Sequence, residues 1–279
     1  KELEQWFFRI TKYADRLLTG LDTIEWSSRV KIAQKEWIGK KTGINISYPV
    51  EGKKEKIVCF TTRPDTNFGA TFVVVAPEYA KANLMSLLDE KKRVEVETYI
   101  KQALGKTEQQ RQQEAKRKTG VFTGLYAINQ LNNEKLPIWV SDFVLAGFGT
   151  GVVVGVPGHD VRDFEFAKAM SLSIKRVVVG SDGDTSEISD IKQVFEDVGR
   201  MVNSEFLNGL DIHEATEKMM DHMVKMGWGE RTVNYHLRDW LVSRQRYWGA
   251  PIPMIFCSSC AKASEGKGWL PVSESDLPV

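Results

Sequence analysis

The sequence is poor in cysteine, with three in 279 residues: Cys59, Cys257 and Cys260. An odd, sparse set in a chain of this length argues against a secreted scaffold held together by disulfide bonds. No apolar run approaches the roughly 20 residues that a membrane-spanning helix needs, and no signal peptide opens the sequence. We therefore expect a cytoplasmic protein with no membrane partner.

The sequence also has no large excess of positive or negative charge, because 38 lysine and arginine residues nearly match 37 aspartate and glutamate residues. The formal net charge of +1 gives no argument for a nucleic-acid partner, so only a local patch could bind one. What the sequence does have is an ordinary globular composition, 42% hydrophobic and 27% charged. This supports one large domain, or a medium domain with flanking pieces. The chain begins at Lys1 without methionine, so we expect a piece of a longer protein.

The spacing of apolar residues predicts a mixed α/β protein. Helical periodicity predicts helices over residues 2–19, 27–39, 78–118, 160–171, 211–227 and 236–247. Short apolar or alternating runs predict strands over residues 43–48, 56–61, 71–76, 134–140, 151–156 and 174–179, with an extended segment at 250–255.

Three features admit a functional and a structural interpretation, and the structural one is favoured for each. Cys257 and Cys260 have zinc-ligand spacing, but a closed site needs four ligands and no second such pair is present, so we expect no metal. The polar stretch 105–119 is typical of a solvated helix rather than of an RNA contact. The methionines between Met219 and Met226 fit core packing better than a soft binding face.

The first candidate segment follows a predicted strand, where residues 61–66 are Thr-Thr-Arg-Pro-Asp-Thr. Three hydroxyls and a guanidinium gather where the strand breaks at Arg63-Pro64. Hydroxyls both donate and accept hydrogen bonds, so they suit a ligand rich in hydroxyl and carbonyl groups. The alternative is a strand end at which the threonines only cap a turn.

The second candidate segment, residues 149–167, passes from a glycine-flanked strand through a Pro-Gly turn into a helix. Asp160 and Asp163 fall at the start of that helix, where a carboxylate accepts bonds from free backbone N–H groups. One interpretation is that they only cap the helix. The other is that one carboxylate projects into a cleft and pairs with a cation. The incomplete glycine pattern here is weak evidence for phosphate binding.

Together these segments resemble the leucyl-tRNA synthetases of bacterial type. Residues 61–71 resemble the threonine-rich editing motif in its leucyl form, and residues 159–163 match the family's His-Asp-x-Arg-Asp turn. Residues 30–39, 118–144 and 237–253 agree with the same family, so the resemblance covers nearly the whole chain. The family's two ATP-site signatures, of His-Ile-Gly-His and Lys-Met-Ser-Lys-Ser type, do not occur.

The resemblance implies a fragment of a leucine–tRNA ligase. Residues 41–235 would form a compact, β-barrel-like editing domain surrounded by helices. Residues 1–40 and 236–279 would be flanking segments of a nucleotide-binding, Rossmann-type catalytic domain. Without the ATP signatures the fragment would not ligate, so ATP and magnesium would serve only the full-length enzyme. Editing would need no cofactor.

The resemblance also implies roles in hydrolysing isoleucyl- or norvalyl-tRNA(Leu) at the tRNA 3′ end. Thr66 aligns with the threonine that acts as a steric gate against leucine. Asp163 aligns with the aspartate that binds the α-ammonium group, and Thr62 completes the expected catalytic set. The remaining expected contacts line the substrate pocket: Thr61, Arg63, Asp65, Phe148, Val154, Val156, His159, Asp160 and Arg162.

No nucleophile–base pair is evident in the sequence, so we expect direct attack by water on an ester that is already activated. Phe148, Val154 and Gly155 depart from the tyrosine, methionine and alanine that are common in the family. These departures bear on which amino acid is preferred and not on the reaction class. The competing hypothesis is a non-catalytic tRNA-binding or structural insertion. We expect a monomer.

Overall fold

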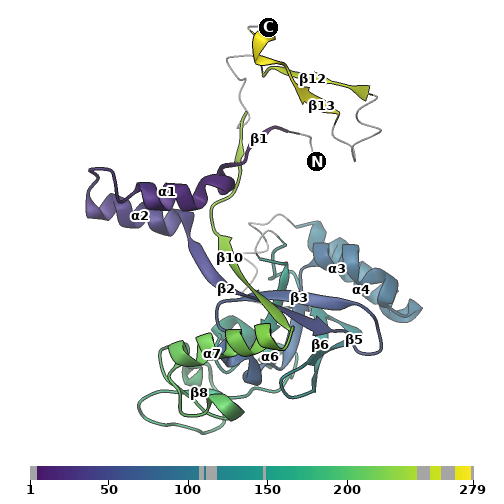
Figure 1. The fold of residues 1–279 in the computed structure, drawn as a ribbon. Helices are drawn as coiled ribbons and strands as arrows, with labels where there is room; N and C mark the ends of the chain where they lie inside the picture. The colour runs from purple at the N-terminus through teal and green to yellow at the C-terminus, as the bar shows by residue number, and fades with distance from the viewer. Residues whose placement is uncertain are drawn as a thin grey trace. The chain divides into compact units, whose positions relative to one another are not determined.

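The computed structural model describes residues 5–106, 110, 118–146, 149–243, 252–258 and 268–277. The chain forms two compact units (Figure 1). The larger unit is Lys40–Asn234, and the smaller one combines Lys1–Gly39 with Tyr235–Val279.

The first sheet of the larger unit has the strand order β10-β2-β3. Its members are β2 (Lys40–Pro49), β3 (Lys56–Thr61) and β10 (Gly229–Tyr235). β2 and β3 form an antiparallel hairpin in which Ile44 pairs with Thr61, around the turn expected at residues 51–54. Alternate residues of β2 are buried, as the period of a half-buried strand requires. The two strands of the hairpin were predicted, and β10 was not.

The second sheet has the order β5-β6-β4-β7. It contains β4 (Phe72–Val75), β5 (Val121–Asn129), β6 (Glu134–Val140) and β7 (Val152–Gly155). β4 is parallel to β6, antiparallel to β7 and fully buried, which explains its continuous apolar sequence. The sequence did not predict β5, whose pairing is interrupted by an irregularity between Phe122 and Tyr126.

The larger unit therefore has two main open sheets and a small two-stranded sheet, β8-β9, and its described residues form no closed barrel, so the barrel-like expectation is not confirmed. A single bridge, Val50 with Ala127, joins the sheets along β2 and β5. The helices are α3 (Pro77–Asn83), α4 (Glu90–Leu104), α6 (Val161–Ala169) and α7 (Ile212–Lys225). The short elements are η2 (Pro64–Gly69), η3 (Met85–Leu87), β8 (Val178–Val179), η4 (Ile191–Gln193), β9 (Arg200–Met201) and η5 (Glu205–Leu207).

Helix α7 contributes to the main core of the larger unit, which also contains residues of both main sheets. Met219, Met220 and Met223 are buried in that core, whereas Met226 is exposed. The core interpretation of the methionines is therefore confirmed for three of the four. The predicted helix over residues 78–118 is divided into α3 and α4, and residues 107–109 and 111–117 of the polar stretch lie outside the described residues.

The smaller unit contains α1 (Ala14–Gly20), α2 (Ser28–Ile38) and the short elements β1 (Phe7–Phe8), η1 (Ile10–Tyr13), β11 (Trp240–Leu241), β12 (Met254–Phe256), β13 (Trp269–Pro271) and η6 (Glu274–Asp276). Helix α2 ends at Gly39, which has the left-handed φ of 57° that favours glycine after a helix. The helix predicted over 2–19 is wrong at residues 5–9, the described part before Ile10, because Phe7 and Phe8 pair with β11.

The helix predicted over 236–247 is also wrong where it is described, since Trp240 and Leu241 are extended. Long-range pairing has overridden the local helical pattern. The buried core of this unit is small and centres on Ala14, Ile38 and Leu237. Its described elements do not confirm a Rossmann-type domain.

Candidate functional site

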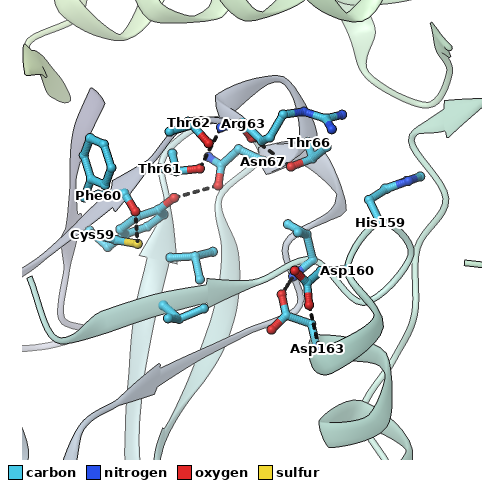
Figure 2. A pocket seen from close by; sticks show the side chains of 14 residues that line it. Cys59, Phe60, Thr61, Thr62, Arg63, Thr66, Asn67, His159, Asp160 and Asp163 are labelled. Carbon is cyan, nitrogen blue, oxygen red and sulfur yellow. Dashed lines mark hydrogen bonds between the residues drawn. The ribbon is translucent and has the colours of Figure 1, made fainter. Parts of the chain in front are cut away.

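One cavity of about 230 Å³ lies in the larger unit between the two segments that the sequence analysis selected. Residues 59–67 form one wall, at the end of β3 and the start of η2. Strand β7 and the start of α6 form the other, and Figure 2 shows Asp160 and Asp163 on that side. Thr66 and Asp163 therefore line the same cavity, although they are distant in sequence. The lining residues are Tyr48, Cys59, Phe60, Thr61, Thr62, Arg63, Thr66, Asn67, Val153, Val154, Val156, His159, Asp160 and Asp163.

The first wall is a turn held by its own threonines. Pro64 starts η2, where a missing N–H is harmless. The Thr61 hydroxyl accepts a bond from the Arg63 N–H at 3.0 Å, and the Thr66 hydroxyl donates to the Arg63 carbonyl at 2.8 Å. The capping interpretation is thus correct for two of the threonines, and both still line the cavity. Thr62 is exposed there.

Arg63 lies at the rim of this wall with a third of its side chain exposed. Its Nε is 3.1 Å from Asp65 Oδ1 and its Nη2 is 2.9 Å from Asp65 Oδ2. Asp65 is fully buried, does not line the cavity, and also accepts a bond from Thr216 of α7 at 3.0 Å. The structure therefore places the Asp65 carboxylate behind Arg63 rather than against a ligand.

The second wall carries two carboxylates held by backbone donors. Asp160 is the N-cap of α6, and its Oδ1 accepts from the N–H groups of Arg162 at 2.8 Å and Asp163 at 3.1 Å. Asp163 is 4% exposed, and its Oδ2 accepts from the Val156 N–H at 2.8 Å. Asp160 therefore does cap the helix, whereas Asp163 reaches back to the neighbouring strand.

Asp163 is the most electrostatically perturbed carboxyl group of the site. Its pKa is raised to about 7, mainly by burial and secondly by the nearby charge of Asp160, while the bond from Val156 opposes the shift. A carboxylate in this position lacks a formal cationic partner in direct contact among the described residues. A positively charged ligand group in the cavity would stabilise its ionised form.

His159 lines the cavity, but its ring nitrogens bind backbone groups. Nε2 lies 2.8 Å from the Val177 nitrogen and 3.1 Å from the Val178 nitrogen, so it accepts both N–H groups. Nδ1 then carries the proton and donates to the Phe195 carbonyl at 2.9 Å. Burial lowers the pKa of His159 to about 4, so the ring is neutral at pH 7. The His159 ring therefore links the backbone at the start of β8 to the backbone at Phe195 and stabilises both segments.

Five lining residues were not selected from the sequence: Tyr48, Cys59, Phe60, Asn67 and Val153. The Tyr48 hydroxyl donates to Asn67 Oδ1 at 2.6 Å, and Asn129 Nδ2 donates to the Asn67 carbonyl at 2.9 Å, beneath the threonine turn. Tyr48 lies on the buried face of β2, but no local pattern pairs it with Asn67. Burial raises the pKa of the Cys59 thiol to about 12, so this lining thiol is protonated at neutral pH.

Val154 and Val156 line the cavity as expected, whereas Arg162 is exposed and is not among the lining residues. Phe148 and Cys260 lie outside the described residues. At Gly155 a Cβ atom would lie 2.1 Å from the Phe72 ring, so a side chain at this position would require the ring to move. Within the described residues, no cluster of three or more potential metal ligands occurs, and no helix is long and apolar enough to cross a membrane.

The family described as "Leucyl-tRNA synthetase, editing domain" matches residues 35–224. Over its whole length the chain is 49% identical to a leucine–tRNA ligase of Caldanaerobacter subterraneus subsp. tengcongensis, 46% to one of Trichodesmium erythraeum and 45% to one of Fervidobacterium nodosum. It covers 32%, 29% and 33% of those proteins, respectively. The chain thus spans about a third of the length of these curated relatives.

Among solved structures, the chain is similar to the synthetase in a ternary complex of Agrobacterium radiobacter K84 agnB2 LeuRS with tRNA and LeuAMS. The TM-score is 0.71 at 35% sequence identity. The match covers 98% of this chain and 29% of that one.

Proposed function

Because the chain belongs to the leucyl-tRNA synthetase family and contains its editing domain, we propose that it hydrolyses the ester bond of mischarged aminoacyl-tRNA(Leu). The observation that carries this proposal is the shared cavity, in which Thr66 faces the wall that holds Asp163. The proposed substrates are isoleucyl- and norvalyl-tRNA(Leu), and the proposed partner is the 3′ end of the tRNA. Ligation, with ATP and magnesium, belongs to the full-length protein.

The need for a second site is physical. A hydrophobic pocket that accepts leucine rejects an amino acid differing by one methylene only about 10–200-fold. Isoleucine has as many atoms as leucine, so the editing site must recognise shape rather than volume. We assign this discrimination to Thr66, which is nearly fully buried at the cavity wall. Val154 and Val156 supply the apolar surface opposite it.

The α-ammonium group of the aminoacyl ester is assigned to Asp163. The buried carboxylate lines the cavity and retains Oδ1 for a ligand, since within the described residues only its Oδ2 accepts a hydrogen bond, from Val156. A charge-assisted bond to an ammonium group is roughly twice as strong as a neutral hydrogen bond. Asp160 holds the first turn of α6 in place and so fixes where Asp163 points.

Water is the proposed nucleophile. The Cys59 thiol remains protonated, and both nitrogens of His159 are bound to the backbone, so neither lining residue offers an activated nucleophile or a free base. An aminoacyl ester is already reactive, and positioning a water molecule against it supplies much of the remaining catalysis. We assign that positioning to the exposed Thr62 hydroxyl and to the neighbouring Thr61.

A single-turnover deacylation assay with excess protein tests the proposal. Isoleucyl-tRNA(Leu) should be hydrolysed well above the spontaneous rate, and leucyl-tRNA(Leu) should be spared. The alternative, a non-catalytic insertion, is supported by the capping bonds of Thr66 and Asp160 and predicts no acceleration for either ester. A folded protein that leaves both esters at their spontaneous rates would overturn the hydrolase proposal, and an acyl-enzyme trapped by acid quench would overturn direct water attack.

A further inference from the structure

Asp65 is a fully buried carboxylate for which the proposed reaction leaves no direct use. It lies in η2 behind the cavity wall, and its side chain is 0% exposed. A buried charge is tolerated only when it is paired and hydrogen-bonded. Arg63 supplies the pairing through Nε and Nη2, which occupy both carboxylate oxygens.

A third residue completes this arrangement from a distant part of the chain. Thr216 lies 151 positions away, on helix α7, and its hydroxyl donates to Asp65 Oδ1 at 3.0 Å. Helix α7 packs against η2 and holds its buried methionines in the core, so Thr216 has a rigid support. The contacts run from α7 through Asp65 to the guanidinium at the cavity rim.

The geometry points to Thr216 and Asp65 as positioning residues that fix the Arg63 guanidinium toward an oxygen acceptor of the aminoacyl-adenosine end of the substrate. This inference rests on the proposed function. With Nε and Nη2 bound to Asp65, the orientation of the planar guanidinium is fixed, and its Nη1 makes no hydrogen bond or ion pair within the described residues. An arginine whose fork is fixed in this way loses less side-chain freedom when it binds a ligand oxygen.

The test compares Thr216→Val, which removes the hydroxyl at nearly constant volume, with Thr216→Ser, which keeps it. We expect Thr216→Val to raise KM for isoleucyl-tRNA(Leu) roughly tenfold, equivalent to about 1.4 kcal/mol, with kcat within about twofold of the parent. Thr216→Ser should restore KM. The control is Thr98→Val on α4, because the Thr98 hydroxyl bonds only the backbone of its own helix.

A double-mutant cycle separates positioning from general destabilisation. In an Arg63→Ala background, Thr216→Val should change KM no further, because its effect passes through the guanidinium. An unchanged KM for Thr216→Val alone, or an equal increase in KM with and without Arg63, would overturn the inference. Thermal unfolding of each variant checks that the fold is retained, and Thr216→Ala, which also removes the hydroxyl, replaces Thr216→Val if that variant fails to fold.

Equilibrium binding of a non-hydrolysable 3′-aminoacyl-adenosine amide distinguishes failure of this inference from failure of the proposed function. If the parent binds the amide but does not hydrolyse tRNA esters, hydrolysis is refuted, and the Thr216→Val effect on Kd still decides the positioning role. If the parent hydrolyses esters and Thr216→Val changes neither KM nor Kd, only the positioning role is refuted. If the parent does neither, both fall.

Discussion

The two walls of the cavity are held by different kinds of interaction. On the threonine side, hydroxyl groups bind the backbone of their own turn. Arg63 forms an ion pair with the buried Asp65, which also accepts a hydrogen bond from Thr216 of α7. On the α6 side, backbone N–H groups hold two carboxylates, one of which is almost completely buried. The first wall therefore offers shape, hydroxyl groups and the Arg63 guanidinium, whereas the second offers buried negative charge. Substrate discrimination and ammonium binding should then respond to different substitutions.

Removing the charge from the second wall should have the largest effect. We expect Asp163→Asn to slow hydrolysis of every aminoacyl ester by about two orders of magnitude or more, because an amide cannot replace a charge-assisted bond to the ammonium group. Single-turnover rates with isoleucyl- and norvalyl-tRNA(Leu) measure this loss. Rates within a few-fold of the parent for both esters would show that the charge of Asp163 is not needed for hydrolysis.

Changing the shape of the first wall should alter selectivity more than rate. Thr66→Ala should raise leucyl-tRNA(Leu) hydrolysis roughly tenfold or more, while isoleucyl-tRNA(Leu) hydrolysis stays within a few-fold. The ratio of the two rates is the measurement. Thr66→Ser keeps the hydroxyl that bonds the Arg63 carbonyl, so it separates loss of bulk from loss of the turn. Equal changes for both esters would show that Thr66 is not the gate.

The raised pKa of Asp163 should make its burial costly at neutral pH. The pKa of Asp163 in the folded state, about 7, exceeds its ordinary value of 3.8 in an unfolded chain. Between pH 3.8 and 7 the folded state therefore binds more protons than the unfolded state. Stability from this group is complete below pH 3.8 and is lost as pH rises through 7. Asp163→Asn should therefore stabilise the fold by on the order of 2–4 kcal/mol at pH 8, and by little at pH 4.

Urea unfolding of parent and Asp163→Asn at both pH values measures this difference. Comparing the two proteins cancels the opposite effect of His159, whose pKa of about 4 favours the folded state above 6.5 and loses that contribution as pH falls toward 4. A variant that is equally destabilised at both values would contradict the burial argument.

The smallest effects should come from Asp160, which belongs to the second wall but acts through the helix end. Asp160→Ala should cost about 1 kcal/mol of stability, because α6 loses its N-cap. Asp160→Asn keeps the cap and removes a charge that raises the pKa of Asp163, so it should shift the pH dependence of hydrolysis to lower pH. An unchanged pH profile in Asp160→Asn would rule out that coupling.

The local patterns of the sequence predicted the elements that form both walls, whereas the roles of their residues came from the resemblance to the family. A strand that ends just before Arg63-Pro64 and a helix that starts after Asp160 are short-range features, and the structure has both. Strand β5 was missed because Gly124 and a pairing irregularity interrupt its alternation. The helix predicted over 236–247 was wrong because β11 pairs with β1, more than two hundred positions away.

The supports behind the walls could not be predicted in the same way. The bonds of Tyr48 to Asn67 and of Thr216 to Asp65 join elements that are far apart in sequence, and no spacing rule relates them. Asp65 was predicted to contact substrate because it lies inside the threonine segment. The position of Asp65 behind Arg63 depends on the direction of one turn of η2, and only the three-dimensional structure shows that direction.

β2 and β10 are adjacent in one sheet, although they stand at opposite ends of the larger unit's sequence. Their pairing continues to the hydrogen bond from the Ser47 N–H to the Trp228 carbonyl. The two ends of the larger unit therefore leave it at one place. The entropic cost of bringing such ends together grows only slowly with the number of residues between them. Because His236 bonds the backbone of Ile38 and Gly39, the two ends of the larger unit stay close together whatever the length of chain between them.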